Sequence, residues 1–252
     1  MASRIEDYAI IGDYHSAALV GLDGSMDWLC LPRFDSGACF AALVGGAEHG
    51  RWLVAPRGGV KRTTRRYRPG TLILETEFET EDGAVRLTDC MPIRDGEANV
   101  VRFVEGLRGR VPMWTELVMR FDYGSVVPWV RSEAGHLRAI AGPDALHLHS
   151  EVELRGENFR TVAEFTVSEG DRVPFVLTWH PSHEPAPKVI DALDGIIQTH
   201  LHWEQWSRRS QVKGKWSEEI LRSLITLKAL TYAPTGGIVA APTTSLPEWI
   251  GS

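Results

Sequence analysis

The sequence predicts a mainly β protein, a large antiparallel two-sheet β-sandwich followed by two helices. From residue 17 to about residue 179, short runs of alternating apolar and polar residues are separated by turns that contain Gly or Asp, the pattern of all-β proteins. About twelve such runs are present, more than one small sandwich needs. Beyond a proline-rich segment the apolar residues recur every three or four positions instead, which indicates helices.

Length and composition fit a globular protein. With 252 residues, 43% of them hydrophobic and 24% charged, the chain can form one large domain or two unequal ones with a well-buried core. The net charge of −6 argues against a nucleic-acid partner, since domains that bind nucleic acid are usually basic. No apolar run approaches the roughly 20 residues of a membrane span, and the first residues do not resemble a secretory signal. We therefore expect a cytoplasmic protein without membrane contact.

The clearest hairpin joins residues 71–80 to residues 84–90 through a turn at Asp82 and Gly83. On its first arm apolar residues and Thr76 fall on one face, and three glutamates, at positions 75, 77 and 79, fall on the other. This period of two is typical of a half-buried antiparallel strand, so we expect the three carboxylates to face solvent. Further arm pairs are predicted at residues 99–107 with 113–121, 127–131 with 136–140, and 161–167 with 174–179.

A linker and two helices follow. Three prolines between residues 180 and 187 disfavour both helix and sheet. Apolar residues from Ile190 onward predict a first helix that ends near Ser210, and a second helix begins at about Ser217 and stops before Pro234. The apolar positions of the second helix cover more than one narrow stripe, so it needs partners on several sides. Left uncovered, this face would favour self-association.

The densest group of candidate site residues follows a predicted strand at residues 26–31. Beyond Pro32 the chain presents Arg33, Phe34 and Asp35, in the kind of loop where binding sites often lie. From the residues alone, the preferred alternative is that Asp35-Ser36 caps a short helical run over residues 38–43.

Other candidates are weaker. The histidine pairs 147 and 149, 180 and 183, and 200 and 202 lack a third ligand at fixed spacing, so we expect ordinary histidines and no metal. The three cysteines form no C-x-x-C pair, which favours buried thiols over a disulfide or zinc site; no cofactor is expected either. The basic run at residues 61–68 could bind an anion but is more typical of a solvated strand lead-in. Most tryptophans fall in strand patterns, which favours packing over sugar stacking.

Five segments of the chain resemble bacterial members of glycoside hydrolase family 15, the glucoamylase and trehalase-like enzymes. In order, they are residues 16–43, 121–129, 141–145, 175–185 and 223–248. The resemblance covers essentially the whole chain, and the last segment is the most specific.

The resemblance implies an enzyme with an amino-terminal β-sandwich, here residues 1–180, a linker with a helix, here residues 181–216, and a catalytic (α/α) barrel that residues 217–252 would begin. Family members hydrolyse α-glucosidic bonds with inversion, using a general acid and a general base. No residue of this chain matches either carboxylate, so no catalytic residue is assigned. The resemblance further implies that Trp28, Arg33 and Asp35 bind substrate or contact the barrel.

Three hypotheses follow. In the preferred one, the chain is the non-catalytic amino-terminal part of a hydrolase that acts on trehalose, maltooligosaccharides or a related α-glucan, with the helical barrel as its partner in cis. The second is a stand-alone sandwich that binds carbohydrate or a partner protein. The third is an independently active enzyme that uses carboxylates within this chain.

Overall fold

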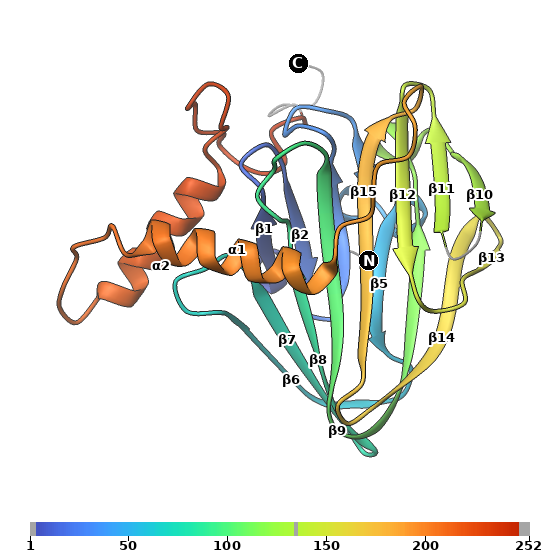
Figure 1. Ribbon diagram of the computed structural model, residues 1–252, viewed down its shortest axis with the longest axis horizontal. Helices are drawn as coiled ribbons and strands as arrows, with labels where there is room; N and C mark the ends of the chain where they lie inside the picture. Colours follow the sequence, from blue (N-terminus) through green and yellow to red (C-terminus); the bar gives the residue numbers. More distant parts are fainter. Residues whose placement is uncertain (1–3, 134–135, 247–252) are drawn as a thin grey trace.

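The structure, a computed structural model, describes residues 4–133 and 136–246 and contains two antiparallel sheets followed by two helices (Figure 1). The expected fold class is confirmed. The predicted turn at residues 134–135, and Pro247 and Glu248 at the end of the last matching segment, lie outside the described residues.

Sheet A has the order β1 (Tyr8–Gly12), β2 (Ala17–Gly21), β3 (Ser25–Cys30), β5 (Arg51–Pro56), β9 (Ala98–Val118), β14 (Arg160–Ser168), β13 (Arg155–Glu157), with β4 (Ala38–Phe40) also paired to β3. Sheet B has the order β6 (Val60–Tyr67), β7 (Leu74–Thr80), β8 (Gly83–Cys90), β9, β15 (Arg172–Pro181), β12 (Asp144–Ser150), β11 (His136–Ala141), β10 (Trp129–Glu133).

Strand β9 belongs to both sheets. Its first half pairs with β8 and β15, and its second half pairs with β5 and β14. The predicted hairpin with a turn between residues 107 and 113 is therefore wrong, because the strand bends and continues from one sheet into the other instead of turning back. A bulge opposite Ala84 and Val85 and a left-handed φ of +66° at Gly109 accompany the passage, as expected where a strand changes direction. A side chain at Gly109 would meet the Asp82 carbonyl at 2.1 Å.

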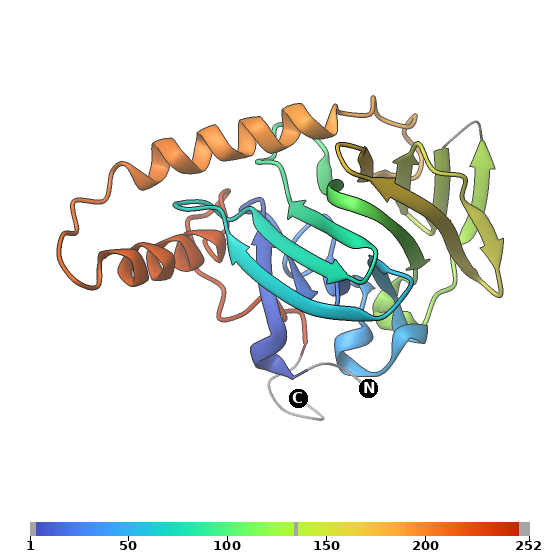
Figure 2. The ribbon, with the colours of Figure 1, turned by 90° about the horizontal axis from the view of Figure 1, so that it is seen from below.

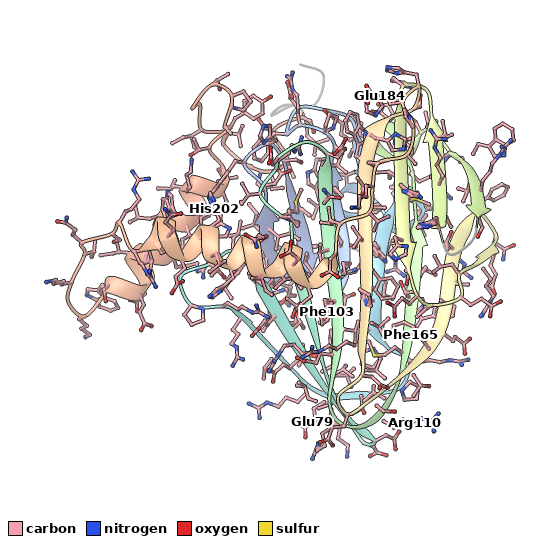
Figure 3. All side chains as sticks on the ribbon, in the orientation of Figure 1. Glu79, Phe103, Arg110, Phe165, Glu184 and His202 are labelled. Atoms are coloured by element: carbon pink, nitrogen blue, oxygen red, sulfur yellow. The ribbon has the colours of Figure 1, made fainter. Side chains whose placement is uncertain are left out.

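The predicted arms at residues 161–167 and 174–179 also differ from expectation. Both strands exist, as β14 and β15, but they do not pair with each other. Each pairs with a different half of β9, so the turn between them bridges the two sheets. Figure 3 places Glu79 and Arg110 at this end of the sandwich and Glu184 at the other.

The core lies between the two sheets. It is formed by large buried side chains from both, among them Phe40, Trp52, Phe78 and Phe175. The stripe of glutamates on β7 is only partly solvent-facing, which corrects one expectation. Glu75 is buried and accepts hydrogen bonds from Arg66 and Arg68 at 3.1 and 2.7 Å. The basic run thus forms strand β6 and its continuation, and part of its charge is balanced by the carboxylates of β7.

Helix α1 (Ala192–Ser207) begins where predicted, with Asp191 as its N-cap through a 2.8 Å bond from the Asp194 amide. It covers the outer face of sheet B, where Ala192 and Ile196 pack with Val101, Phe103 and Val176 (Figures 2 and 3).

Helix α2 (Ser217–Ala229) also begins close to the predicted position. It packs against α1 and the first strands through Ile225 and Ala229, which contact Trp203 and Tyr14. Ile220, Leu224 and Leu227 remain exposed, so one apolar face of this helix is uncovered. No helix among the described residues is long and apolar enough to cross a membrane.

The predicted helical run at residues 38–43 is wrong. Ala38–Phe40 form strand β4, and only Ala42–Val44 make a single 3₁₀ turn. Pairing with β3 overrides the local helical pattern, and Asp35 caps no helix here. The remaining 3₁₀ turns are Ile5–Asp7, Ala47–His49 and Asp122–Gly124.

Candidate functional site

The loop after β3 presents an exposed ion pair. Arg33 Nε donates to Asp35 Oδ1 at 2.8 Å, and the second guanidinium arm donates to Asp35 Oδ2. Both side chains are about half exposed, 52% and 58%. The hydrogen bonds from Arg33 lower the pKa of Asp35. The structure therefore brings these two predicted residues together as a bidentate pair that faces solvent.

A buried ion pair anchors the base of this loop. Asp13 is fully buried and accepts hydrogen bonds from Arg94 Nε and Nη2 at 2.8 and 2.6 Å. Arg94 Nη1 in turn donates to the Pro32 carbonyl at 2.7 Å, next to Arg33. The Phe34 amide donates to the His15 carbonyl at 2.8 Å. Long-range bonds thus hold the loop, and the sequence offered no signal for them.

The segment that follows α2 completes one wall of the site. The Tyr232 ring lies edge-on to His15 and Phe34, with centroid distances of 5.7 and 6.4 Å. The Arg33 guanidinium lies 5.8 Å from the centre of the same ring. The loop is therefore in contact with the part of the chain that leads away from the second helix.

Trp28 lies in strand β3, which leads into this loop. Its indole is fully buried, and Nε1 donates to the Pro242 carbonyl at 2.9 Å. Leu246 packs on the same cluster, and Tyr123 donates to the Ser245 carbonyl at 3.3 Å. Trp28 thus contacts the carboxy-terminal segment of the described chain, in keeping with a packing role rather than an exposed sugar platform.

A groove of about 600 Å³ runs beside the loop. Its lining comes from three segments that are far apart in the sequence: residues 31–37, 121–126 and 141–144. All three belong to segments on which the family resemblance rests. The sequence identified them one by one, and the fold shows that they meet at one place.

No catalytic carboxylate is recognisable in the described part of the chain. A general acid needs an accessible carboxyl group with a raised pKa. Burial raises the pKa of Asp89 against the opposing effect of Arg102, but this carboxylate is fully enclosed and hydrogen-bonded to Arg102. It cannot meet a substrate. Within residues 4–133 and 136–246, no cluster of His, Cys, Asp and Glu could hold a metal ion.

Comparisons with known proteins agree on one family. Residues 1–185 match the family described as "Trehalase-like, N-terminal". The trehalase of Mycolicibacterium smegmatis is 34% identical over 97% of this chain, which spans 40% of that protein. The trehalase of Thermoplasma volcanium is 28% identical over 98% of this chain and 41% of its own length.

A solved structure supports the fold. A bacterial glucoamylase complexed with acarbose superimposes with a TM-score of 0.66 over 96% of this chain and 43% of its own, at 12% identity. The chain therefore spans about 40% of the length of the curated relatives that it matches.

Proposed function

The chain belongs to the family of trehalase-like N-terminal domains, and from that membership we propose that it is the non-catalytic amino-terminal part of an α-glucoside hydrolase. The observation that carries the proposal is the alignment of 97% of this chain with 40% of a trehalase. The inverting acid and base would be supplied by a helical barrel that continues beyond residue 252. Trehalose is the substrate that the names of the relatives favour, and maltooligosaccharides are the alternative suggested by the glucoamylase.

We propose the domain division expected from the sequence, with a sandwich at residues 1–180, a linker with its helix at residues 181–216, and the start of a helical barrel at residues 217–252. The exposed apolar face of α2 supports a partner in cis, because Ile220, Leu224 and Leu227 would be covered by further barrel helices. Self-association through this face is the alternative. A cytoplasmic location stays a prediction.

The test of the proposed function is the activity of the 252-residue chain alone. We expect no glucose release from trehalose or maltotriose, with the Mycolicibacterium smegmatis trehalase as the positive control. The intact mass of the native protein in its own cell is expected to exceed that of this chain. Turnover by the chain that a single Asp or Glu substitution abolishes would contradict the proposal, and so would a native mass equal to that of the chain.

Within the longer enzyme, we propose that Arg33 and Asp35 border the mouth of the active site and that Trp28 is a contact to the following domain. The D35A substitution should lower kcat/KM by about threefold to tenfold. It should change the free energy of unfolding by less than about 1 kcal/mol, because exposed ion pairs contribute little to stability.

The matched control is E157A, which removes a second half-exposed pair of the same spacing, between Arg155 Nε and Glu157 Oε1 at 2.8 Å. This variant should leave kcat/KM unchanged. Equal kinetics for D35A and the unmodified enzyme would remove the loop from the proposed site.

A further inference from the structure

The outer face of strands β10, β11 and β12 carries a row of basic side chains. The strand register places Arg131 opposite Arg138, and Arg138 opposite His147. His136 and His149 are likewise paired across β11 and β12. Like charges directly opposite each other in a sheet are destabilising, so this arrangement needs an explanation.

Among the described side chains, no carboxylate forms an ion pair with Arg131 or Arg138. The Arg138 side chain donates through Nη2 to the Ser182 carbonyl at 3.0 Å, while its Nε is buried without a partner. Two permanent positive charges therefore lie opposite each other in the sheet, and no described ion pair balances either of them.

The histidines are in close contact with one another. The ring centroid of His136 lies 5.0 Å from that of His147 and 4.7 Å from that of His149. Burial, followed by the positive groups His136, His180 and Arg138, lowers the pKa of His147. The pKa of His149 is also lowered, mainly by burial, although Glu151 opposes this. The Nδ1 atoms of His136 and His149 lie 3.1 Å apart, within hydrogen-bond distance. A bound anion would favour the protonated form of His147 and so oppose the effect of burial on its pKa.

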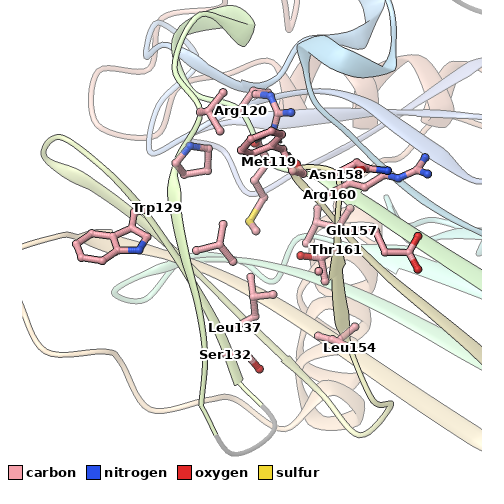
Figure 4. Close-up of a pocket in the computed structure, with 16 residues that line it drawn as sticks. Met119, Arg120, Trp129, Ser132, Leu137, Leu154, Glu157, Asn158, Arg160 and Thr161 are labelled. Carbon is pink, nitrogen blue, oxygen red and sulfur yellow. Dashed lines mark hydrogen bonds between the residues drawn. The ribbon is translucent and has the colours of Figure 1, made fainter.

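These groups surround a pocket of about 520 Å³. Its lining includes Trp129, Arg131, His136, Arg138 and His147, and Ala186 of the linker closes one side. Trp129 is 70% exposed, with the Arg131 guanidinium 4.4 Å from its ring centre. Trp129 also borders the neighbouring groove between β10 and the β13–β14 hairpin, but in Figure 4 its indole points away from the other residues that line that groove. Helix α1 does not reach this part of sheet B (Figure 1).

We propose that this pocket binds a phosphorylated sugar, with the phosphate between Arg131 and Arg138 and the pyranose ring against Trp129. Guanidinium groups bind phosphate oxygens in a bidentate geometry. A phosphate dianion matches the two positive charges of Arg131 and Arg138, which lie opposite each other in the sheet. An exposed indole offers an apolar surface to the C–H face of a sugar. The pocket volume is within the range of small-molecule sites. This inference does not rest on the proposed hydrolase function, since it uses none of the loop or helix contacts described above.

Isothermal titration calorimetry on the 252-residue chain tests the proposal with three probes: glucose 6-phosphate, inorganic phosphate and glucose. We expect glucose 6-phosphate to bind with a Kd of about 1 mM or tighter, at least about fivefold tighter than inorganic phosphate, and glucose alone not to bind. R131Q and R138Q should each weaken binding about tenfold, as expected for loss of a charge-assisted hydrogen bond. W129A should abolish the preference over inorganic phosphate.

The matched control is R62Q, the same change at an exposed arginine on edge strand β6, which should leave binding unchanged. Because Arg138 also holds the linker, R131Q is the variant that tests the anion contact without loss of a described hydrogen bond. Nuclear magnetic resonance should show a rise in the pKa of His147 when glucose 6-phosphate is added. Absence of binding by glucose 6-phosphate, or equal binding by R131Q and the unmodified chain, would overturn the proposal. Equal affinity for inorganic phosphate would overturn the assignment of a sugar ligand.

Discussion

The R102M variant is expected to lose about 3–5 kcal/mol of its free energy of unfolding, the cost typical of breaking a buried ion pair by removing one partner. Arg102 lies in β9 and is 0% exposed. Its Nε donates to Asp89 Oδ1 at 2.8 Å, and methionine would leave that carboxylate buried without its counter-ion. Methionine fills a space similar to that of arginine, so the lost free energy of unfolding reflects charge and hydrogen bonding more than volume.

The guanidinium also joins the two sheets. Its Nη2 donates to the Gly24 carbonyl at 2.7 Å and its Nη1 to the Trp52 carbonyl, both in sheet A or its turns, whereas Asp89 lies in sheet B. Three acceptors from three parts of the chain therefore depend on one side chain. Without it, the buried Asp89 carboxylate would lose its hydrogen-bond donor, and the Gly24 and Trp52 carbonyls would each lose one bond, which is costly in the interior. The Gly24 carbonyl would keep its bond from the Val54 amide at 3.2 Å.

Urea unfolding followed by tryptophan fluorescence measures the loss. The control is R62M, the same substitution at an exposed position, with an expected change within about 0.5 kcal/mol. The double variant D89L/R102M should recover part of the stability, because no unpaired charge remains, but not all of it, because the Gly24 and Trp52 carbonyls still lack their bonds from the guanidinium. A value for R102M within about 1 kcal/mol of the unmodified chain would contradict this account.

Elements whose signal is local could be predicted from the sequence. The β7–β8 hairpin follows from strict alternation on its first arm and the turn at Asp82 and Gly83. Both helices follow from apolar residues at helical spacing, and their starts lie within two residues of the predicted positions. In each case neighbouring residues decide the structure.

Elements decided by distant partners could not be predicted. Gly109 and Pro112 are ordinary turn residues, and only the pairing of β9 with strands from both sheets makes them part of a continuous strand. Ala38–Phe40 form a strand because β3 lies beside them.

In the candidate site, too, residues with a local signal could be predicted, and residues placed by contacts across the fold could not. Arg33 and Asp35 were identified from local polarity, and they do form a pair. Arg94, Tyr232 and the groove shared by three segments depend on contacts across the fold. His136 was not selected as a candidate, because the register of β11 against β12 brings it to His149 and no sequence spacing shows this.

The second large effect is expected at Trp28. W28A should lower the free energy of unfolding by about 3–5 kcal/mol, as for other large-to-small changes of buried aromatic residues. The indole is fully buried among Cys30, Ala38 and Ala41, which are small and cannot fill the cavity. Removal of the ring also removes the Nε1 donor to the Pro242 carbonyl.

Hydrogen exchange distinguishes the loss of packing in the sandwich from the loss of contact with residues 241–246. The amides of Thr244 and Leu246 are hydrogen-bonded within the turn at residues 241–246. In W28A they should exchange faster than the loss of global stability alone accounts for, because this segment packs against the indole ring. W28F keeps most of the apolar contact but lacks the donor, so it should lose less stability, about 1–2 kcal/mol.

The matched control is W129A, the same change at a tryptophan that is 70% exposed, with an expected stability change within about 0.5 kcal/mol. If W28A destabilised the sandwich while residues 244 and 246 kept their protection, Trp28 would be a core residue only. Its proposed role as a contact to the following domain would then fail. Faster exchange confined to residues 241–246 would instead locate the beginning of that contact at the indole, on the strand that leads into the loop with Arg33 and Asp35.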